Sequence, residues 1–533
     1  MSFKKRIITI LIIGVLVLTT VAVAVLYSPV VNNGEESLLS LSRKETIYIW
    51  YTDESLTAYI SSAAVSYAES HNVRIMPVLE SGSEYLERIN QASLSEECPD
   101  LYVVSHDSLE KAYLAGLADE VEPTQRIIMG EEYPQVAIDA VSYKDKILGY
   151  PFYFETSSLL YNKTYIEEMA RRQLEQEADE AAALEAQQNL EEFGPEEGSE
   201  LPKQEADAAG EAGTLNDIDE GMPDITADGQ AGDSAQDSLD PAEIDARIRE
   251  ILPETIEDIK VFADEYDAPE QVEAVFKWDV NDIFYNYFFV GNSMIVGGNA
   301  GDNVNNINIY NRQSINSMRM YQELNQFFAI DTAEVEYSAI LDDFISGRIV
   351  FTVATSDAVA RLEQAKEDGM FAYEYGVTNT PDIDAETPTK SLSMTNCVVV
   401  NGYSEHRQVA NDFAYYLTAE CADNLYARTG KAAAANNTDY GYHNLDAFFD
   451  EYTKSIPLPK MIETSNFWIQ LEIMFAEIWD GADVNQKLKE LSEQIMTQIT
   501  GEPYTEEMIE ENLVEDAVEY LDEELYRQEA MEE

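Results

Sequence analysis

The stretch TIYIWYTDESLTAYISSAAVSYAESHNVRIMPVL, residues 46–79, decides the fold of this chain. Its two ends, Thr46–Thr52 and Val73–Leu79, are short apolar runs that predict strands, and the apolar residues between them recur at helical spacing. The chain then repeats this alternation, with a helix, a strand and a helix expected at Tyr85–Ala92, Asp100–Ser105 and Leu109–Ala115. Because parallel neighbouring strands need such crossovers, we predict an α/β fold with a parallel, doubly wound sheet.

Acidic side chains follow the first and the third of these strands. Asp53 and Glu54 come directly after residues 46–52, and Asp107 comes shortly after Ser105. Open sheets of this kind bind ligands beyond the carboxyl ends of their strands. Carboxylates form strong, directional hydrogen bonds, so we expect these three side chains to contact a ligand.

The composition excludes some functions. The 533 residues include 102 acidic and 33 basic side chains, which gives a net charge of −69. Nucleic acids need a basic surface, so nucleic-acid binding is not expected. The excess charge is instead interpreted as a means of keeping an exported protein soluble and monomeric. A chain of this length is too long for one compact core, which predicts two to four domains or a two-lobed body.

Sequence motifs for catalysis and for metal binding are missing as well. The three cysteines, Cys98, Cys397 and Cys421, show neither a disulfide framework nor a metal-site spacing. The four histidines lack zinc-type spacing, and neither Gly-x-Ser-x-Gly nor a phosphate-binding glycine loop occurs. Among 102 acidic residues, paired carboxylates carry little information about glycoside hydrolysis. We therefore expect no enzyme, no cofactor and no metal, with a glycoside hydrolase as a remote alternative.

The sequence begins with an export signal. Basic residues within Met1–Arg6 precede an uncharged apolar run, Ile7–Leu26, which is long enough to cross a bilayer. We favour an uncleaved anchor over residues 1–27 and a linker over residues 28–44, with the rest of the chain outside the cytoplasm. Cleavage at the Ala-Val-Ala site of residues 22–24 is the alternative. No cysteine lies near the apolar run, so a lipid anchor is not expected.

Two acidic stretches differ in character from the rest of the chain. Residues 171–251 are rich in acidic residues and alanine and nearly lack aromatic residues. We predict a low-complexity insertion that is helical up to about Leu190 and disordered beyond it. It is interpreted as a tolerated surface loop, with a spacer as the alternative. The second stretch, residues 501–533, keeps apolar residues at rough helical spacing and predicts a surface helix with a frayed end.

Four stretches carry a family resemblance. They are DLYVVSHD (residues 100–107), LGYPFYFETSSLLYNK (148–163), FISGRIVFTVATSDAVARL (344–362) and PLPKMIETSNFWIQLEIMFAEIWDG (457–481). In this order they resemble bacterial extracellular solute-binding protein family 1, the sugar-binding proteins of ABC transporters typified by the maltodextrin-binding protein. The resemblance covers most of residues 45–499 apart from the acidic insertion.

The resemblance implies a two-lobed, periplasmic-binding-protein-like fold of type II, in which each lobe is a mainly parallel sheet flanked by helices. The implied ranges are 45–150 and 396–452 for the first lobe, and 151–170, 252–395 and 453–500 for the second. Extended crossovers would join the lobes and act as a hinge. They are expected at Gly149–Glu155, Ser391–Val400 and Tyr452–Pro459.

The resemblance also implies a function. The protein would capture a carbohydrate, in the first instance an oligosaccharide, in the cleft between the lobes, close by hinge motion and deliver the sugar to the permease of an ABC transporter. Sugar recognition needs aromatic faces and fixed polar groups. Further ligand-binding candidates, chosen by their place in a family motif, after a strand or in an aromatic-rich run, are Glu155, Trp278, Asp279, Tyr285, Ser356, Asp357 and Trp468.

Alternatives to sugar uptake stay open. Val104 stands where the maltodextrin-binding member has a tryptophan, so the sugar need not be a maltodextrin. The same fold could also bind a peptide, a polyamine or a metal chelate, or it could report ligand occupancy to a membrane kinase as a sensor. A cleft with few aromatic residues would favour the non-sugar solutes.

Overall fold

The computed structural model describes residues 44–95, 98–121, 127, 130–192, 239–328, 330–332 and 335–510. Thr46–Glu533 forms one compact unit, whose architecture follows. The expected anchor and nearly all of the expected linker lie outside the described residues. Across the part of the chain that the structure describes, no helix combines the length and the apolar character needed to cross a membrane.

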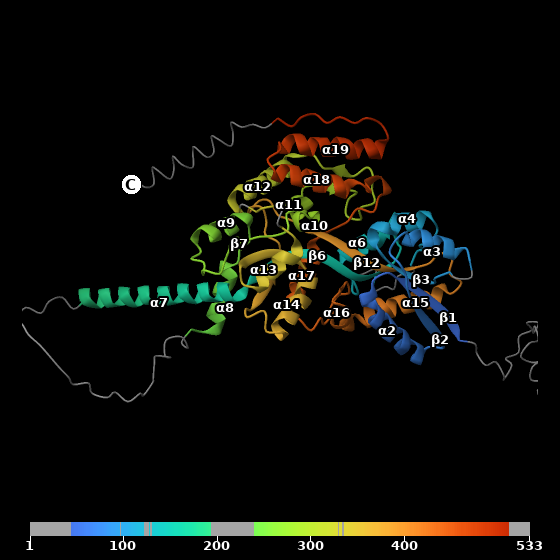
Figure 1. Ribbon diagram of the computed structural model, residues 1–533, viewed down its shortest axis with the longest axis horizontal. Helices are drawn as coiled ribbons and strands as arrows, with labels where there is room; N and C mark the ends of the chain where they lie inside the picture. The colour runs from blue at the N-terminus through green and yellow to red at the C-terminus, as the bar shows by residue number, and fades with distance from the viewer. Residues whose placement is uncertain are drawn as a thin grey trace, which may run out of the picture. The chain divides into compact units, whose positions relative to one another are not determined.

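Three strands form the outer part of the first lobe. β1 (Glu45–Tyr51) lies between β2 (Val73–Leu79) and β3 (Leu101–Ser105), and it pairs in parallel with β3. The helices that follow these strands in turn are α2 (Thr57–Ser70), α3 (Tyr85–Ser93) and α4 (Leu109–Leu114). α2 packs on one face of the sheet and α3 and α4 on the other, each face with its own buried cluster (Figure 1). The predicted alternation of strands and helices is confirmed.

One long strand, β6 (Tyr150–Asn162), belongs to both lobes. Its first half pairs antiparallel with β12 (Leu392–Val400) and β13 (Ala432–Ala433), and its second half with β10 (Ile349–Thr355) and β11 (Tyr375–Thr378). The sheet therefore continues between the lobes in the order β2-β1-β3-β12-β6-β10-β7. The two-lobed α/β fold is confirmed, but its central strands are antiparallel, because the segments that cross between the lobes run back past one another.

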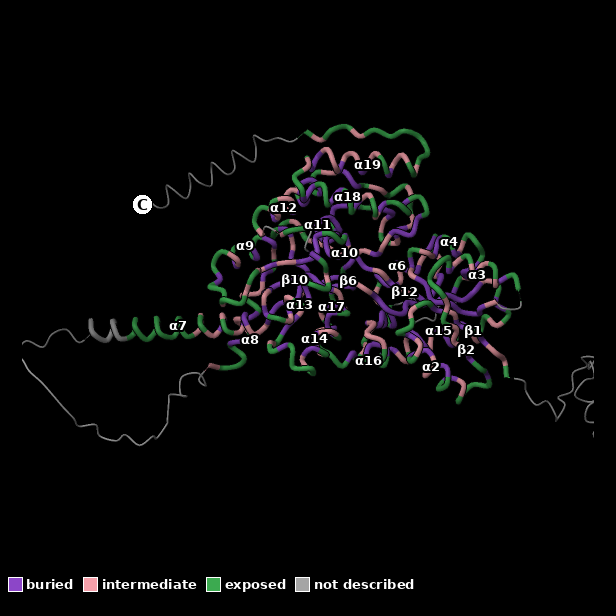
Figure 2. Tube along the Cα trace, in the orientation of Figure 1, coloured by how far each residue is buried: buried purple, intermediate pink, exposed green. Residues whose placement is uncertain are grey.

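Helices surround the second-lobe strands, of which β7 is Ala274–Phe276. The main ones are α9 (Ile256–Glu265), α12 (Arg312–Phe328), α13 (Tyr337–Ile345), α14 (Asp357–Glu367), α18 (Phe467–Trp479) and α19 (Val484–Thr500). Shorter elements of the two lobes are α6 (Gln135–Val141), β4 (Ser142–Tyr143), β5 (Lys146–Ile147), α10 (Ile283–Asn286), α11 (Phe288–Gly291), β8 (Ile295–Val296), β9 (Ile307–Asn308), α15 (Arg407–Tyr415), α16 (Leu425–Thr429) and α17 (Asn444–Lys454). Buried residues concentrate along the central strands (Figure 2).

The three predicted crossovers lie side by side. β14 (Ile456–Pro457) pairs in parallel with the start of β12, and β12 pairs with β6, so the three connections are neighbouring strands. Side chains fasten them together. The rings of Phe154 and Tyr452 stack with their centroids 4.2 Å apart, and the Tyr452 hydroxyl lies 2.7 Å from Oγ1 of Thr395.

The acidic insertion begins and ends in helices. α7 (Lys163–Glu192) ends two residues after Leu190, close to the predicted end of this helix. The predicted disorder is wrong for α8 (Pro241–Ile251), which starts with Asp240 accepting a hydrogen bond from the Ala242 amide at 2.9 Å. This helix forms because Ile244 and Ile248, one turn apart, are buried, a pattern that the acidic composition hid. The part between these helices, residues 193–238, lies outside the described residues.

The C-terminal stretch differs from its prediction. Residues 503–510 are not helical, although a surface helix was expected here. They lie along α19, where the Ile509 amide donates to the Tyr310 hydroxyl at 2.8 Å and the Ile509 carbonyl accepts from the Asn485 side chain at 3.0 Å. These contacts take the backbone groups that a helix would use for itself. Residues 511–533 lie outside the described residues.

Candidate functional site

A cavity opens at the carboxyl ends of β1, β2 and β3, where the sheet topology predicts a ligand site. Its volume is about 480 Å³, and we call it the strand-end pocket. Asp53 and Leu56 line it after β1, Ser105 and Ser108 after β3, and Tyr153 contributes from β6. The rest of its lining is Thr52, Gly82, Glu84, Tyr85, Leu86, Glu87, Val103, Val104, Lys111 and Asn396.

An ammonium group joins two of the predicted carboxylates. The Nζ atom of Lys431 lies 3.4 Å from Oδ2 of Asp53 and 3.3 Å from Oε1 of Glu155, and 5.5 Å from the centre of the Tyr153 ring. We call these four residues the Lys431 cluster. Asp53 is held in place by the amide and the hydroxyl of Ser55, at 2.9 and 2.7 Å. The cluster therefore connects the first strand end with the strand that both lobes share.

Local structure brings Lys431 to this position. Gly430, in the left-handed conformation at φ 70°, ends α16 and turns the chain toward β6. The run Ala432–Ala435 that follows is buried, and its small side chains allow Ala432 and Ala433 to pair with β6. Sequence reasoning missed Lys431. The signal that could have found it is a lone cation between a helix-ending glycine and a run of small residues.

The charges of the cluster stabilise one another. Burial favours the neutral form of Asp53, but hydrogen bonds from Ser55 and the charge of Lys431 hold the pKa of Asp53 below its usual value. Burial likewise disfavours the charged form of Lys431, yet Glu155 and Asp53 raise its pKa above the usual value. At neutral pH Asp53 is therefore ionised and Lys431 is protonated.

One face of β6 leads from the pocket toward the second lobe. Tyr153, Glu155 and Ser157 alternate along the strand and so share a face. Glu155 is the one residue of β6 that is not fully buried. Ser157 pairs with Thr355 of β10, and its hydroxyl donates to the Phe284 carbonyl at 3.3 Å. Tyr153 of the strand-end pocket and Ser157, which pairs with the end of β10, are thus four residues apart along one face of β6.

Aromatic and polar residues meet at that second-lobe strand end. The rings of Tyr285 and Tyr337 stack with centroids 4.7 Å apart. The Tyr337 hydroxyl lies 3.1 Å from Oγ1 of Thr355 and 3.2 Å from Oδ1 of Asp357, and the Thr355 hydroxyl also bonds to Asp357. Asp357 is exposed, whereas Tyr285 is 7% exposed. Of these predicted candidates, Asp357 exposes its carboxylate to solvent, and buried Tyr285 stacks on Tyr337, whose hydroxyl bonds to Asp357.

Ser356 links the two lobes through its backbone. Its side chain is buried, and its carbonyl accepts a hydrogen bond from the Tyr426 hydroxyl of α16 at 3.0 Å. α16 belongs to the first lobe and precedes Lys431. Ser356 is therefore placed at a contact between the lobes, close in sequence to Asp357.

Trp278 and Asp279 belong to the core and not to the candidate site. Trp278 is 0% exposed, stacks on Phe276 at 4.5 Å and donates from Nε1 to Oδ1 of Asn286 at 2.8 Å. The Asp279 carboxylate is buried, which raises its pKa, and it accepts hydrogen bonds from the amides of Asn281 and Tyr337. A ligand could reach neither side chain without repacking the lobe. Both were expected to contact a ligand. The prediction failed because an aromatic-rich sequence is the same pattern whether the segment lines a cleft or fills a core.

The remaining candidates are at least partly exposed. Glu54 and Asp107 are exposed and are not among the residues that line the strand-end pocket, although Ser105 and Ser108 on either side of Asp107 do line it. Trp468 lies in the first turn of α18, half-buried, with its ring 5.6 Å from that of Tyr287. Trp468 was predicted to face a different direction from Phe467, and the two side chains do differ in burial, since Phe467 is fully buried.

A histidine that the sequence did not single out ties the pocket to the hinge. His106 is 0% exposed, and its Nδ1 accepts from the Thr395 amide at 3.1 Å while Nε2 lies 3.0 Å from the Leu458 carbonyl. Burial, assisted by the positive charge of Lys460, lowers the pKa of His106 to about 4. The imidazole is therefore neutral at physiological pH, and it connects the end of β3 to two of the three crossovers.

Two more buried ionisable groups lie at the crossovers. The Glu451 carboxylate accepts hydrogen bonds from the hydroxyls of Ser391 and Thr380, at 2.7 and 2.9 Å, and burial raises its pKa. Lys460 donates to the carbonyls of Asp139 and Ala300, and burial lowers its pKa to about 8. The hydrogen bonds of Glu451 and Lys460 are therefore made within the protein, next to the predicted crossovers.

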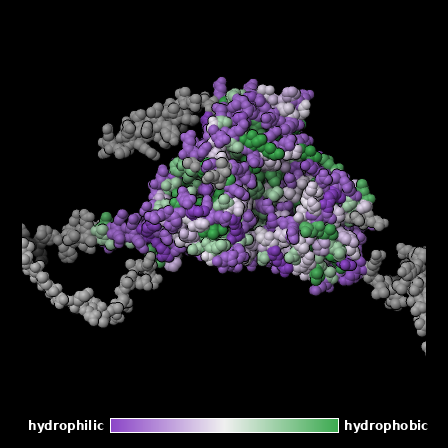
Figure 3. Space-filling model, in the orientation of Figure 1, coloured by the Kyte–Doolittle hydropathy of each residue, from purple (hydrophilic) through white to green (hydrophobic). Residues whose placement is uncertain are grey.

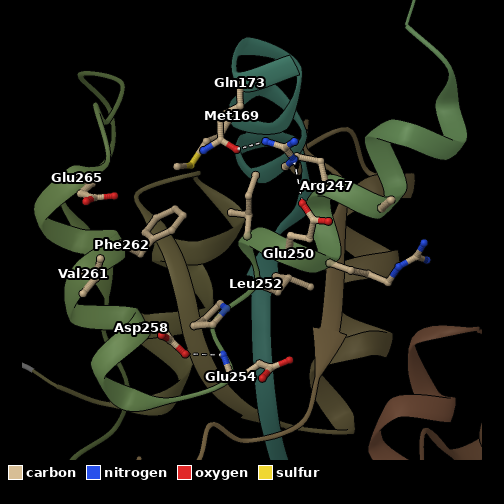
Figure 4. Close-up of a pocket in the computed structure, with 14 residues that line it drawn as sticks. Met169, Gln173, Arg247, Glu250, Leu252, Glu254, Asp258, Val261, Phe262 and Glu265 are labelled. Carbon is tan, nitrogen blue, oxygen red and sulfur yellow. Dashed lines mark hydrogen bonds and ion pairs between the residues drawn. The ribbon is translucent and has the colours of Figure 1, made fainter. Parts of the chain in front are cut away.

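A second cavity, of about 740 Å³, lies between α7, α8 and α9 on the second lobe (Figure 4). Two of its charged residues make contacts that stabilise the surrounding helices. Arg247 forms two hydrogen bonds with Glu177, at 2.8 and 2.9 Å, and Asp258 accepts from the amides of Glu254 and Thr255 to cap α9. These contacts hold the helices around the insertion together, and they leave the strand-end pocket as the better candidate.

No group of three or more histidine, cysteine, aspartate or glutamate side chains among the described residues could hold a metal ion. The three cysteines are free, and Cys397 is buried. The surface over the described residues is largely hydrophilic with scattered apolar patches, one of them over α18 (Figure 3).

Comparisons with known proteins agree with the two-lobed α/β fold. A family model described as bacterial extracellular solute-binding protein matches residues 62–440. A solved extracellular solute-binding protein from Staphylococcus aureus, in complex with maltose, is 16% identical with a TM-score of 0.63, covering 86% of this chain and 98% of that one. A cyclo/maltodextrin-binding protein complexed with maltotetraose is 15% identical with a TM-score of 0.62, covering 86% and 98%. A maltose-binding periplasmic protein from Listeria monocytogenes, also with maltose, is 17% identical with a TM-score of 0.60, covering 87% and 100%. At these identities the likeness establishes a common fold.

Proposed function

Because this chain belongs to the bacterial extracellular solute-binding protein family, we propose that it captures a carbohydrate outside the cytoplasm and delivers it to the permease of an ABC transporter. The observation that carries the proposal is the Lys431 cluster. It sets two carboxylates and one ammonium beside a cavity of about 480 Å³, on the strand that both lobes share. No chemical step is required of the protein.

The chemistry of the pocket suits a sugar. Hydroxyl groups both donate and accept hydrogen bonds, so they can be bound by the Asp53 and Glu155 carboxylates and by the Lys431 ammonium together. The faces of sugar rings are apolar and pack against aromatic side chains. Tyr85 and Tyr153 line the pocket and could supply such surfaces. We propose Trp468, which is half-buried on the second lobe, as a further one.

Closure would follow from the position of the site. Glu155 lies on β6 at the crossovers, and Asp357 is exposed at a second-lobe strand end. A solute that touched residues of both lobes would bind the closed form more tightly and so shift the population toward it. We propose Asp53, Glu155, Asp357 and Trp468 as contacts from the two sides, with Glu54 and Asp107 at the edge. The closed, loaded form would be the one that the permease accepts.

The setting proposed for this function is the outer face of a membrane. Residues 1–27 would hold a monomeric protein to the membrane as an uncleaved anchor, and residues 28–44 would link it to the lobes. Release after cleavage at residues 22–24 is the alternative arrangement. In either arrangement the lobes stay outside the cytoplasm, where the solute is captured.

A cationic solute such as a polyamine is a second candidate, favoured by one observation. Asp53 and Glu155 of the Lys431 cluster and Glu84 and Glu87 of the pocket wall bring four carboxylates, against the ammonium groups of Lys431 and Lys111. An excess of negative charge attracts cations. A sensor that reports occupancy to a membrane kinase would use the same site and differ in its partner.

A thermal-shift screen of the full-length protein in detergent tests the proposal. A solute that binds the native state alone raises the melting temperature, so mono- and oligosaccharides should produce shifts. Glu155→Gln should reduce the shift, whereas Glu367→Gln, at the exposed end of α14, should preserve it. Shifts with polyamines or peptides but with no saccharide would contradict the carbohydrate assignment. Failure to copurify with permease subunits from crosslinked membranes would contradict the transport role.

A further inference from the structure

We propose that the excess of carboxylates around Lys431 sets the charge of the solute, so that the site accepts uncharged sugars and rejects acidic ones such as uronic acids, while the Lys431 ammonium limits this rejection. This inference rests on the proposed function and specifies its substrate class. The geometry behind it is the placement of one ammonium between two carboxylates at the edge of the strand-end pocket.

The positive charge of Lys431 is already neutralised inside the protein. Its Nζ atom lies 3.4 Å from Asp53 and 3.3 Å from Glu155, and its pKa is raised by the same two carboxylates against the effect of burial. One positive and two negative charges leave the cluster with a net negative charge. A carboxylate on a sugar would therefore meet two carboxylates before it found a cation.

The pocket wall adds to this imbalance. Glu84 and Glu87 line the cavity together with Lys111, which again sets two carboxylates against one ammonium. Both groups of charges have the same sign of excess, so an acidic solute gains nothing by shifting from one to the other. An uncharged sugar avoids the repulsion and still uses every hydrogen-bonding group.

Hydrogen-bonding capacity favours the same class of solute. Oδ1 of Asp53 accepts from Ser55, and Oδ2 faces Lys431, while Glu155 faces Lys431 through Oε1. A carboxylate can accept about four hydrogen bonds, so both retain free acceptor positions. These positions suit sugar hydroxyls, which are donors, and they repel the oxygens of a second carboxylate, which are acceptors.

Lys431 is fixed well enough to act as a specificity determinant. Its ammonium lies 5.5 Å from the centre of the Tyr153 ring, and its backbone adjoins Ala432, which pairs with β6. Without the ammonium, Asp53 and Glu155 would face each other uncompensated. Lys431 therefore positions both carboxylates for the solute and limits the negative charge that the solute encounters.

Calorimetric titrations of the full-length protein with matched saccharides test the proposal. Each neutral oligosaccharide is paired with the same oligosaccharide carrying one terminal uronic acid. The neutral member should bind at least tenfold more tightly at low salt, and the ratio should shrink at high salt because screening weakens charge repulsion. The selectivity ratio is a quantity that a merely structural residue would leave unchanged.

Substitutions assign the selectivity to the cluster. Glu155→Gln removes one negative charge and should narrow the ratio severalfold, while Lys431→Gln removes the positive charge and should widen it. Lys260→Gln, on α9 of the second lobe, changes the net charge of the chain by the same amount as Lys431→Gln. It should leave the selectivity ratio unchanged. The melting temperature of each variant shows whether it is folded. The selectivity ratio of the wild-type protein tests the proposal even if a variant fails to fold.

The outcomes separate the two proposals. Equal affinity for neutral and acidic members would overturn the charge selectivity and leave carbohydrate binding standing. A ratio that Lys431→Gln and Glu155→Gln leave unchanged would overturn the role of Lys431. Binding of no saccharide at all would overturn carbohydrate binding, and this inference with it.

Discussion

Asp53, a candidate at a first-lobe strand end, and Trp278 and Asp279, candidates in the aromatic-rich run of the second lobe, differ in burial. In the first lobe Asp53 remains partly exposed at a strand end and meets Glu155 through Lys431. In the second lobe Trp278 and Asp279 are buried and satisfied by neighbouring core residues. Residues that follow a strand of a parallel sheet are brought to its open edge by topology. Residues of an aromatic-rich run have no such constraint, and most of them fill the core.

The largest effect is expected for Trp278, which we assign to the core. Trp278→Ala should lower the free energy of unfolding by about 4 kcal/mol, because it removes a large buried side chain and leaves the Asn286 carbonyl oxygen without its donor. Denaturant titration measures the loss. Trp468→Ala, on a half-buried side chain, should cost less stability yet weaken solute binding. If Trp278→Ala lowered affinity with unchanged stability, the assignment of Trp278 to the core would be wrong.

His106 sharpens the comparison, because it lies beside the first-lobe pocket but behaves as a core residue. Its pKa of about 4 in the folded protein is below the ordinary 6.5, so the unfolded chain binds the proton more readily between these values. The contribution of neutral His106 to the free energy of unfolding is complete above about pH 6.5. It should fall by about 3 kcal/mol as the pH approaches 4.

Paired unfolding curves isolate this histidine from the many carboxylates. His106→Asn cannot be protonated, so its free energy of unfolding should fall less steeply between pH 6.5 and pH 4.5 than that of the wild type. The difference between the two slopes is the contribution of His106. Parallel curves over this range would show that His106 is not held neutral by the fold.

For Asp53 we expect a small effect on stability and a larger one on solute binding. Asp53→Asn should change the free energy of unfolding by less than about 1 kcal/mol, since an ion pair of partly exposed groups contributes little. Solute affinity should nevertheless fall about tenfold, which corresponds to one charged hydrogen bond. Calorimetry and denaturant titration of the same sample measure both quantities. A large loss of stability with unchanged affinity would make Asp53 a structural residue.

Local patterns explain what could be foreseen. The strands and helices of residues 46–115 depend on neighbours within a few residues, and the structure confirms them. The prediction failed for α8, where two buried isoleucines outweigh an acidic composition, and for residues 503–510, where contacts with Tyr310 and Asn485 replace a helix. In both cases the decisive partner is distant in sequence.

The sequence by itself determined the alternation of strands and helices, the strand ends that carry Asp53, and the family to which the chain belongs. Only the tertiary structure decided that Lys431 meets Glu155 across 276 residues, that Trp278 is buried, and that His106 is held neutral at the crossovers. The spacing of apolar residues that predicts strands and helices is a property of neighbouring residues, so it can be recognised in the sequence. Burial and ion pairing depend on which segments the folded chain brings together, and no local pattern records that.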